Sequence, residues 1–345
     1  MVKLGRERGV ILAGLVLILV YPWGVTAVGQ PFLIGLGTRI LVMGLAAASL
    51  DLIVGFGGMV SFGHAAFFGI GGYVVGILAF HAHAGTDLLG FIPGSNQALV
   101  VWPAAILVAG LAALAIGALS LRTRGVHFIM ITLAFAQMLF FLFVSLRTYG
   151  GDDGLSFRPR NLVPGLDTRN DTSFYYVVAM LLVGFLVLAR RLLDARFGMV
   201  LRGVRENERR LAALGIAPYG IKLAAFTLSG AVAGLAGALM ANQARFVSPE
   251  LLHWTKSGDL LIMVILGGIG TLYGPVLGAA VLILLETVLA QWTDHWMIVL
   301  GPVLVALILF ARGSQDGVFL HSCAVICTHK QPYGSAGDVC RSLCS

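Results

Sequence analysis

A short stretch in the first fifth of the chain contains three side chains that could take part in chemistry. Asp51, Ser61 and His64 lie within or beside strongly apolar runs, in the sequence DLIVGFGGMVSFGHAAFFGIGGY. Ser61 and His64 are three residues apart and could share one helix face, as a nucleophile and its base require. No third group is placed to orient the histidine, and the chain has no G-x-S-x-G, H-E-x-x-H or G-x-x-x-x-G-K-[ST] motif. The sequence therefore indicates neither a catalytic site nor a means of using ATP.

The same polar groups fit a pathway for a small polar solute. Ionisable side chains are costly inside a bilayer and often mark a substrate pathway. Glycines at such a place allow irregular backbone and close helix contact. Gln137 lies inside the apolar run 126–146 and is expected to face a cavity or another helix. The candidate pathway residues are Asp51, Gly57, Gly58, Ser61, His64 and Gln137.

Structural roles are the alternative for these side chains. Ser61 could cap the helix that follows it, and His64 could hydrogen-bond a nearby backbone group. Asp51 is predicted near the end of a membrane span, which favours a structural role. Glu286, in the apolar run VLILLETVLAQ, is the other acid inside a predicted span and could pair with a basic group.

The longest strongly polar run between two apolar segments is RGVRENERRLAALG, residues 202–215. In lipid, each of its charged side chains would cost about 2.5 kcal/mol or more. Glu206 and Arg210 have the i,i+4 spacing that favours a helix, and Gly215 and Pro218 predict its end. We therefore predict a short cytoplasmic helix that docks a soluble partner, with a solvated loop as the alternative. The candidate contact residues are Arg202, Arg205, Glu206, Asn207, Glu208, Arg209, Arg210 and Gly215.

Composition places these motifs in an integral membrane protein. Of the 345 residues, 58% are hydrophobic and 11% are charged, whereas about 25% are charged in a typical soluble domain. The 45 glycines suit closely packed membrane helices. The net charge of +7 lies in short loops between apolar runs, which is the positive-inside pattern. We expect contact with a lipid bilayer and none with nucleic acid.

We predict an all-α, polytopic integral membrane helix bundle of about ten transmembrane helices, with both termini in the cytoplasm. The first apolar run resembles a signal peptide but lacks a convincing cleavage site, so we interpret it as a retained anchor. Residues 29–38 are predicted as an outside turn that places Arg39 at the outer end of a span, and residues 242–257 are also placed outside. The predicted spans are 10–28, a span from residue 40 that includes Asp51, 65–80, 98–121, 126–146, 174–188, 221–241, 260–266, 276–290 and 296–310.

Two glycine-rich interruptions divide apolar runs near opposite ends of the chain. They are GFGG at 55–58 and GGIG at 267–270. Either could be a turn or a re-entrant segment, so the number of spans could differ by one or two. Broken helices in corresponding positions are typical of transport pathways built from repeats. No clear sequence repeat accompanies them, which weakens this argument.

The end of the chain differs in composition from the rest. All four cysteines, Cys323, Cys327, Cys340 and Cys344, occur there. Their C-x3-C spacing differs from the C-x2-C of many zinc sites, so we favour a disordered tail over a metal site. We divide the chain into a transmembrane domain, 1–313, with a cytoplasmic loop at about 189–219, and an atypical tail, 314–345.

Three blocks of sequence together point to one protein family. They are DLIVGFGGMVSFGHAAFFGIGGYVVGIL (51–78), FGMVLRGVRENERRLAALGIAPYGIKLAAFTLSGAVAGLAGAL (197–239) and FVSPELLHWTKSGDLLIMVILGGIGTLYGPVLGAAVLILLE (246–286). In this order they resemble the N-terminal signature, the cytoplasmic loop with its following span, and the C-terminal signature of LivM-type permease subunits of branched-chain amino-acid ABC importers. After Arg312 the sequence departs from the brief basic tail of that family.

The resemblance implies a permease subunit that moves Leu, Ile or Val inward across the bacterial cytoplasmic membrane, with no cofactor and no catalytic site of its own. It also implies a second, LivH-like permease, two cytoplasmic ATPase subunits and a periplasmic or extracellular solute-binding protein. ATP binding would move the coupling helix at 202–215 and switch the side on which the permease pair is open. Permeases for urea or short amides share much of this pattern. An ion-coupled secondary transporter is less well supported, because Asp51, His64 and Glu286 are a small set of intramembrane charges.

Overall fold

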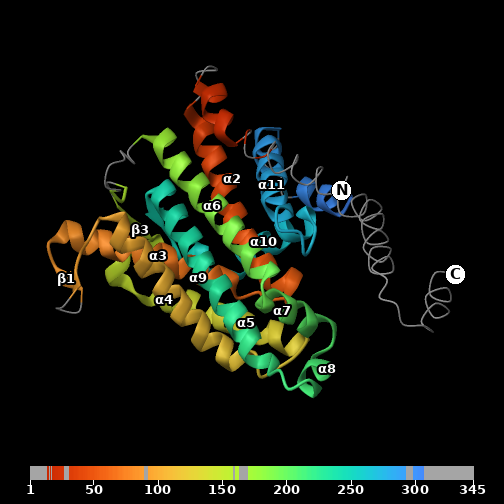
Figure 1. The fold of residues 1–345 in the computed structure, drawn as a ribbon. Coiled ribbons are helices and arrows are strands. Elements are labelled where there is room, and N and C mark those ends of the chain that lie inside the picture. Colours follow the sequence, from red (N-terminus) through yellow and green to blue (C-terminus); the bar gives the residue numbers. More distant parts are fainter. Residues whose placement is uncertain are drawn as a thin grey trace. The chain divides into compact units, whose positions relative to one another are not determined.

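A computed structural model of the chain describes residues 14, 16, 18–26, 31–88, 92–157, 160–162, 170–292 and 298–306. These residues form an all-α bundle (Figure 1), as the sequence predicts, with two minimal antiparallel strand pairs, β1–β2 and β3–β4. The long elements are α2 (Pro31–Asp51), α3 (His64–Ala84), α4 (Ala98–Ser120), α5 (Val126–Ser145), α6 (Asp171–Asp194), α7 (Arg196–Glu206), α9 (Pro218–Ala244), α10 (Trp254–Gly267) and α11 (Gly274–Trp292). The short elements are the π-helix η1 (Leu52–Phe56), β1 (Asp87–Leu88), β2 (Ile92–Pro93), η2 (Arg147–Tyr149), η3 (Gly151–Asp153), β3 (Leu155–Ser156), α8 (Glu208–Ala213), β4 (Phe246–Val247) and η4 (Pro249–Leu252).

Seven helices in the described part of the chain are long and apolar enough to cross a membrane. They are Phe32–Phe56, His64–Ala84, Ala98–Ser120, Val126–Ser145, Asp171–Asp194, Pro218–Ala244 and Gly274–Trp292. The prediction of about ten spans also counted α10, which has 14 residues. Because a helix rises 1.5 Å per residue, α10 is about 21 Å long and falls short of the roughly 30 Å hydrocarbon core. The first and last predicted spans lie partly outside the described residues.

The centre of the bundle is α9, which packs most extensively against α3 and α4 (Figure 1). Small residues allow this close approach. A Cβ added at Gly71 would lie 1.9 Å from the Gly234 carbonyl oxygen, and one added at Gly237 would lie 1.7 Å from the Phe68 carbonyl oxygen. Helix association in lipid depends on such van der Waals contact between backbones. The glycine-rich composition is therefore explained by helix packing in the core as well as by the two interruptions.

The first part of α2 corrects the prediction of an outside turn at residues 29–38. The helix begins at Pro31, a residue that suits the first helical position because its missing N–H needs no partner there. Gly37 then allows contact with an aromatic ring, since an added Cβ would lie 2.4 Å from Tyr21 Cε1. Arg39 consequently lies inside a spanning helix rather than at its end, and its Nη2 is 3.6 Å from Glu286 Oε2 on α11.

The segment 242–257 packs partly against the helices of the bundle, and its outside position stays a prediction. After α9 ends, η4 folds back against α3, where an added Cβ at Gly69 would lie 2.3 Å from Leu252 Cγ. Leu252 is fully buried, because its apolar side chain has this helix surface to pack on. Ser257 Oγ, at the start of α10, accepts a hydrogen bond of 2.9 Å from the Ala65 amide at the start of α3.

Both glycine interruptions are breaks between helices, and the fold brings them together. The first break follows η1, with Gly58 at φ 66°, and the second follows α10, with Gly268 and Gly270 at φ 98° and 80°. Such backbone conformations favour glycine. An added Cβ at Gly55 would lie 2.4 Å from the Gly270 amide nitrogen, so the two breaks are in backbone contact.

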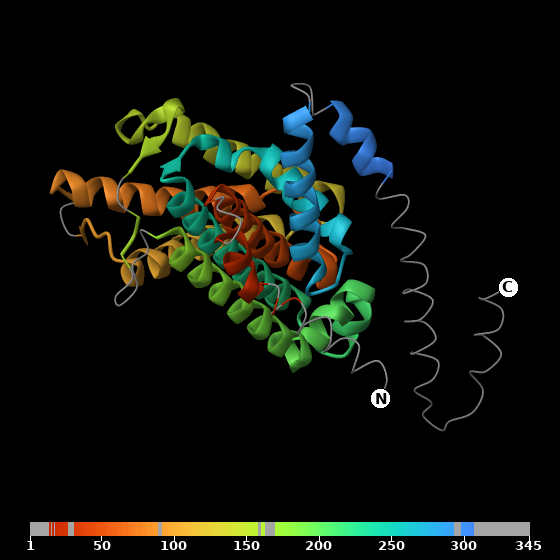
Figure 2. The same cartoon turned by 90° about the horizontal axis from the view of Figure 1, so that it is seen from above.

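The chain divides into two compact units, Met1–Val288 and Leu289–Ser345. The first unit contains all the side chains discussed below. Within it, α7 and α8 follow the end of α6 in both views (Figures 1 and 2). Asp171, at the start of α6, is therefore separated from α7 by a helix of 24 residues, about 36 Å long.

Candidate functional site

The predicted docking helix at 202–215 is two helices, which corrects the prediction of one. The first, α7, begins earlier, at Arg196, and the chain breaks at Asn207 before α8. The reason is local capping, since Asn207 Oδ1 accepts a hydrogen bond of 3.1 Å from the Arg210 amide. Gly203 permits the tight corner, because an added Cβ would lie 3.0 Å from Leu211 Cδ1. Gly215 has φ 81° directly after α8, as expected for a glycine that ends a helix.

We call α7 and α8 with Gly215 the coupling segment, residues 196–215. Its buried side chains, Leu201, Val204 and Leu211, hold it against the bundle. Its exposed side chains form a charged surface. They include the predicted contact residues Arg202, Arg205, Glu206, Asn207, Arg209 and Arg210.

Arg205 also reaches inward from the coupling segment to the first glycine break. Its Nη1 donates a hydrogen bond to the Gly55 carbonyl oxygen in η1. An added Cβ at Gly58 would lie 2.9 Å from Arg205 Cγ, so the side chain passes directly over the break. One turn earlier on α7, the Arg202 guanidinium stacks over the Phe56 ring at 5.6 Å. Movement of α7 would therefore act directly on η1.

Asp51 links the second glycine break to the region where Arg205 meets the first glycine break. Its Oδ1 accepts a hydrogen bond of 2.8 Å from the Gly270 amide, and the side chain is buried. A Cβ added at Gly270 would lie 3.7 Å from Arg205 Nη1. Asp51, Gly55, Arg205 and Gly270 thus form one cluster, here named the break cluster. It connects α2, α7 and the turn between α10 and α11.

Glu208 has an anchoring position within the coupling segment. Its Oε2 lies 3.1 Å from Arg124 Nη2, in the connection between α4 and α5. Its Oε1 pairs with Lys222 Nζ near the start of α9. Side-chain exposures of 23% for Glu208 and 15% for Lys222 make this pair less screened than an ordinary surface salt bridge. Glu208 therefore holds α8 to α9 and to the connection between α4 and α5.

The structure gives Ser61 and His64 separate partners. Ser61 Oγ accepts a hydrogen bond of 3.2 Å from the Gly63 amide and so supports the turn that leads into α3. His64 Nε2 lies 2.7 Å from Ser229 Oγ on α9, rather than beside a nearby backbone group. Ser229 Oγ donates to the Ser49 carbonyl oxygen, so His64 Nε2 must carry the proton and act as donor. This chain of hydrogen bonds ties α3, α9 and α2 together.

The other predicted pathway residues lie nearby or on a separate helix. Gly57 is buried and Gly58 is exposed, and both lie in the break that follows η1. Gln137 lies on α5, partly buried, and its Nε2 has no hydrogen-bond partner among the described residues. The long-range partners Gly270, Ser229 and Ser257 were not predicted, because each is separated from its contact by more than a hundred residues.

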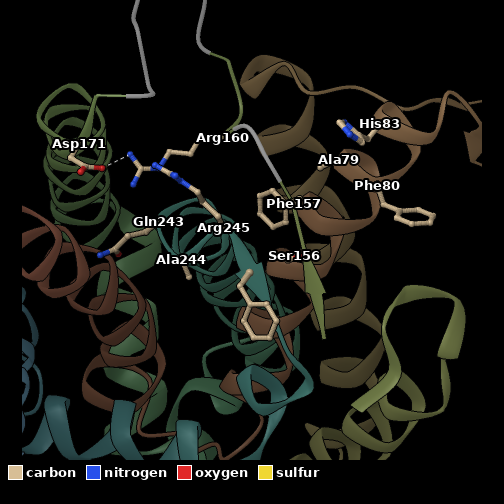
Figure 3. A pocket seen from close by; sticks show the side chains of 11 residues that line it. Ala79, Phe80, His83, Ser156, Phe157, Arg160, Asp171, Gln243, Ala244 and Arg245 are labelled. Atoms are coloured by element: carbon tan, nitrogen blue, oxygen red, sulfur yellow. Dashed lines mark ion pairs between the residues drawn. The ribbon is translucent and has the colours of Figure 1, made fainter. Parts of the chain in front are cut away.

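Two neighbouring pockets lie at the end of the bundle where α6 begins and α9 ends, and Figure 3 shows the side chains that line the first of them. Their volumes are about 830 and 400 Å³, and both are lined by Arg160, Asp171 and Gln243. Arg160 Nη1 lies 2.7 Å from Asp171 Oδ1, and Arg160 Nε donates a hydrogen bond of 3.1 Å to the Asn242 carbonyl oxygen. Gln243 Nε2 donates to the Gly35 carbonyl oxygen at 2.5 Å. None of these residues was singled out from the sequence.

No group of three or more His, Cys, Asp or Glu side chains suited to a metal ion occurs in the part of the chain that the structure describes. The four cysteines of the tail lie outside that part.

Residues 32–308 match the sequence profile of a family described as the permease component of the branched-chain amino acid transport system. The chain belongs to this family. The high-affinity branched-chain amino acid transport system permease proteins LivM of Salmonella typhimurium and Escherichia coli are each 30% identical to it over an alignment of 315 positions that covers 83% of this chain and 71% of each relative. The resemblance seen in the three sequence blocks is thereby confirmed.

This permease is also similar to a second kind of relative over a shorter stretch. The autoinducer 2 import system permease protein LsrC of Klebsiella pneumoniae is 30% identical over an alignment of 175 positions that covers 48% of each chain. No solved structure matches this permease. The comparisons place it among multi-pass membrane permease subunits of ABC transporters.

Proposed function

We propose that this permease subunit moves branched-chain amino acids, Leu, Ile or Val, inward across a bacterial cytoplasmic membrane. The observation that carries the proposal is the 30% identity to LivM over most of both chains. The LsrC similarity covers less than half of each chain and gives weaker support to an autoinducer-like solute.

We propose that it works with a LivH-like permease, two cytoplasmic ATPase subunits and an external solute-binding protein. On this proposal both termini and the coupling segment lie in the cytoplasm. The coupling segment contacts an ATPase through its exposed charged side chains and passes the motion inward through Arg205. The break cluster then repositions η1 and the turn after α10, which changes the side on which the permease pair is open. Residues 1–313 are the permease domain, and 314–345 are an accessory tail.

Two other functions are the alternatives. A urea or short-amide importer of the same family would use the same parts, because its binding protein selects the solute. An ion-coupled secondary transporter would use intramembrane charges such as Arg39 and Glu286. The contact of α7 with the break cluster favours the ATP-driven importer, because it gives force from a soluble subunit a direct path into the membrane helices.

The test is purification of the tagged chain from its native membrane, identification of co-purified proteins by mass spectrometry, and reconstitution of the complex. We expect two ATPases and a second permease, together with ATP-dependent uptake of labelled leucine in the presence of the binding protein. Preferential uptake of urea, a short amide or autoinducer 2 would show that the solute is that compound and not a branched-chain amino acid. Uptake driven by an ion gradient with this chain alone would refute the ATP-driven mechanism.

A further inference from the structure

We propose that the pocket at the Arg160–Asp171 pair is a binding site for an apolar α-amino acid in its zwitterionic form. The solute carboxylate binds Arg245, its ammonium group binds Asp171, and its side chain lies against the neighbouring aromatic rings. The class of solute rests on the proposed function. The location of the site follows from the charges and shape of the pocket.

The charges in this pocket are unbalanced in favour of an anion. Asp171 shares the pocket with two arginines, Arg160 and Arg245, and Figure 3 shows Arg245 beside Arg160. Arg160 is only 7% exposed and is fixed by Asp171, by the Asn242 carbonyl group and by the Phe174 ring, 4.9 Å from its guanidinium carbon. Arg160 therefore positions Asp171, and Arg245, which is exposed, is the cation available to a ligand. Asp171 remains half-exposed and can accept an ammonium group as well.

The backbone of Arg245 supports a role for its side chain. Arg245 is the one non-glycine residue in the described ranges with positive φ, at φ 56° and ψ 28°, directly after α9. Glycine or asparagine suits this left-handed position at a helix end, whereas other side chains are strained there. Strained residues cluster at ligand sites, where the surrounding structure holds them. Arginine at this position places a long cationic side chain over the pocket.

The remaining lining suits an apolar side chain. Ala79, Phe80, Phe157 and Phe246 contribute aliphatic and aromatic surface to the same pocket. Its volume of about 830 Å³ lies within the range of small-molecule sites, roughly 300–1,000 Å³. A few charged groups among apolar walls are the usual design of such sites.

The second pocket adjoins this site and extends along α2. It shares Arg160, Asp171 and Gln243 with the first pocket and extends to Arg39, which lies inside a spanning helix and is 42% exposed. A charged side chain with that exposure is too costly to face lipid. Arg39 and Glu286 are therefore expected to face water or another subunit, which continues a polar surface from the pocket toward the membrane interior.

The test is equilibrium binding of labelled L-leucine to the purified, intact transporter complex without its binding protein. Leucinamide, which lacks the carboxylate, and 4-methylpentanoate, which lacks the ammonium group, serve as competitors. We expect the wild type to prefer leucine over both. Arg245→Asn should weaken leucine binding about 10- to 100-fold and abolish the preference over leucinamide, because one charge-assisted contact is lost. Asp171→Asn should abolish the preference over 4-methylpentanoate.

Conservative and remote variants keep the result interpretable. Asn is chosen at position 245 because it tolerates the left-handed backbone conformation there. Arg245→Lys and Asp171→Glu keep the charges, so these two variants should retain most of the leucine binding. Arg190→Asn is the matched control, since Arg190 is exposed and pairs with Asp194 at the other end of α6.

Each contrary outcome has a definite meaning. Equal affinity for the three compounds in the wild type, or an unchanged preference in Arg245→Asn, overturns the proposal. If Arg245→Asn weakens only binding of the solute-binding protein, the pocket is a protein contact and the proposal fails. Leucine uptake measured on the same preparation distinguishes failure of the binding site from failure of the proposed function. Normal uptake without leucine binding at this pocket refutes the site alone, whereas absence of leucine uptake refutes the proposed function.

Discussion

At the scale of the residue, Arg205 is the side chain that joins the coupling segment to the membrane part of the chain. The sequence predicted its position in a docking helix, because charge and helix-ending signals are local. Its contact with Gly55 could not be predicted, since the two residues are 150 positions apart and neither is unusual by itself. The same holds for Asp51, whose partner Gly270 lies 219 residues away. Local sequence patterns predict where a helix lies and which residues share one of its faces, whereas these pairs depend on how the helices pack.

Replacing Arg205 should separate ATP hydrolysis from uptake. Arg205→Ala removes a charged hydrogen bond to Gly55, a contact worth about 1.5–3 kcal/mol, so α7 would move without repositioning η1. We expect the amount of solute transported per ATP hydrolysed in proteoliposomes to fall several-fold while ATPase activity persists. Arg190→Ala, on the exposed face of α6, is the control and should behave as wild type. An unchanged ratio in Arg205→Ala would show that this contact transmits nothing.

Glu208 should matter for the stability of the coupling segment. Glu208→Gln leaves the poorly exposed Lys222 without its carboxylate partner and also frees Arg124. We expect a loss of about 1–3 kcal/mol in local stability, seen as faster cleavage between α8 and α9 by protease in detergent. Asp194→Asn, which breaks an exposed pair with Arg190, should cleave at the wild-type rate. Equal cleavage of both variants would argue against an anchoring role for Glu208.

At the scale of the element, hydropathy predicted most spanning helices and both glycine breaks, because long apolar runs and glycine clusters are strong local signals. Helix ends that depend on one residue were less predictable. Pro31 starts α2 before residue 40, where this span was predicted to begin, and Asn207 divides one predicted helix into two by capping α8. The buried position of η4 was missed, since its apolar side chains are few and the surface they cover belongs to α3.

The contact between α3 and α9 should be intolerant of even one methyl group. At Gly237 an added Cβ would overlap the Phe68 carbonyl oxygen, which is backbone and cannot rotate away. We expect Gly237→Ala to lower the melting temperature of the purified complex markedly, consistent with the 1–3 kcal/mol or more that overpacking costs. Gly184→Ala on α6 is the matched control, because its added Cβ meets nothing within 4 Å. Similar melting temperatures for the two variants would contradict this packing.

At the scale of the whole molecule, the family match ends at residue 308, and the described residues end at 306. The tail from residue 314 onward therefore stays a prediction from composition alone. We expect a chain truncated after Gly313 to assemble with its partners and to take up solute at the wild-type rate. Uptake and co-purification measured on the same preparation test this, and loss of assembly would show that the tail belongs to the permease domain.

The backbone contacts of Gly71 with Gly234 and of Gly237 with Phe68 have a consequence for how this permease can move. The two contacts lie about one turn apart on each helix, so the backbones of α3 and α9 are closely packed where they cross. We therefore expect α3 and α9 to move together during transport. The non-helical segments of this region are residues 57–63 and 268–273, where several glycines occur. If the permease pair switches between two states, we expect the backbone to bend at these two segments while α3 and α9 move together as a stiff pair.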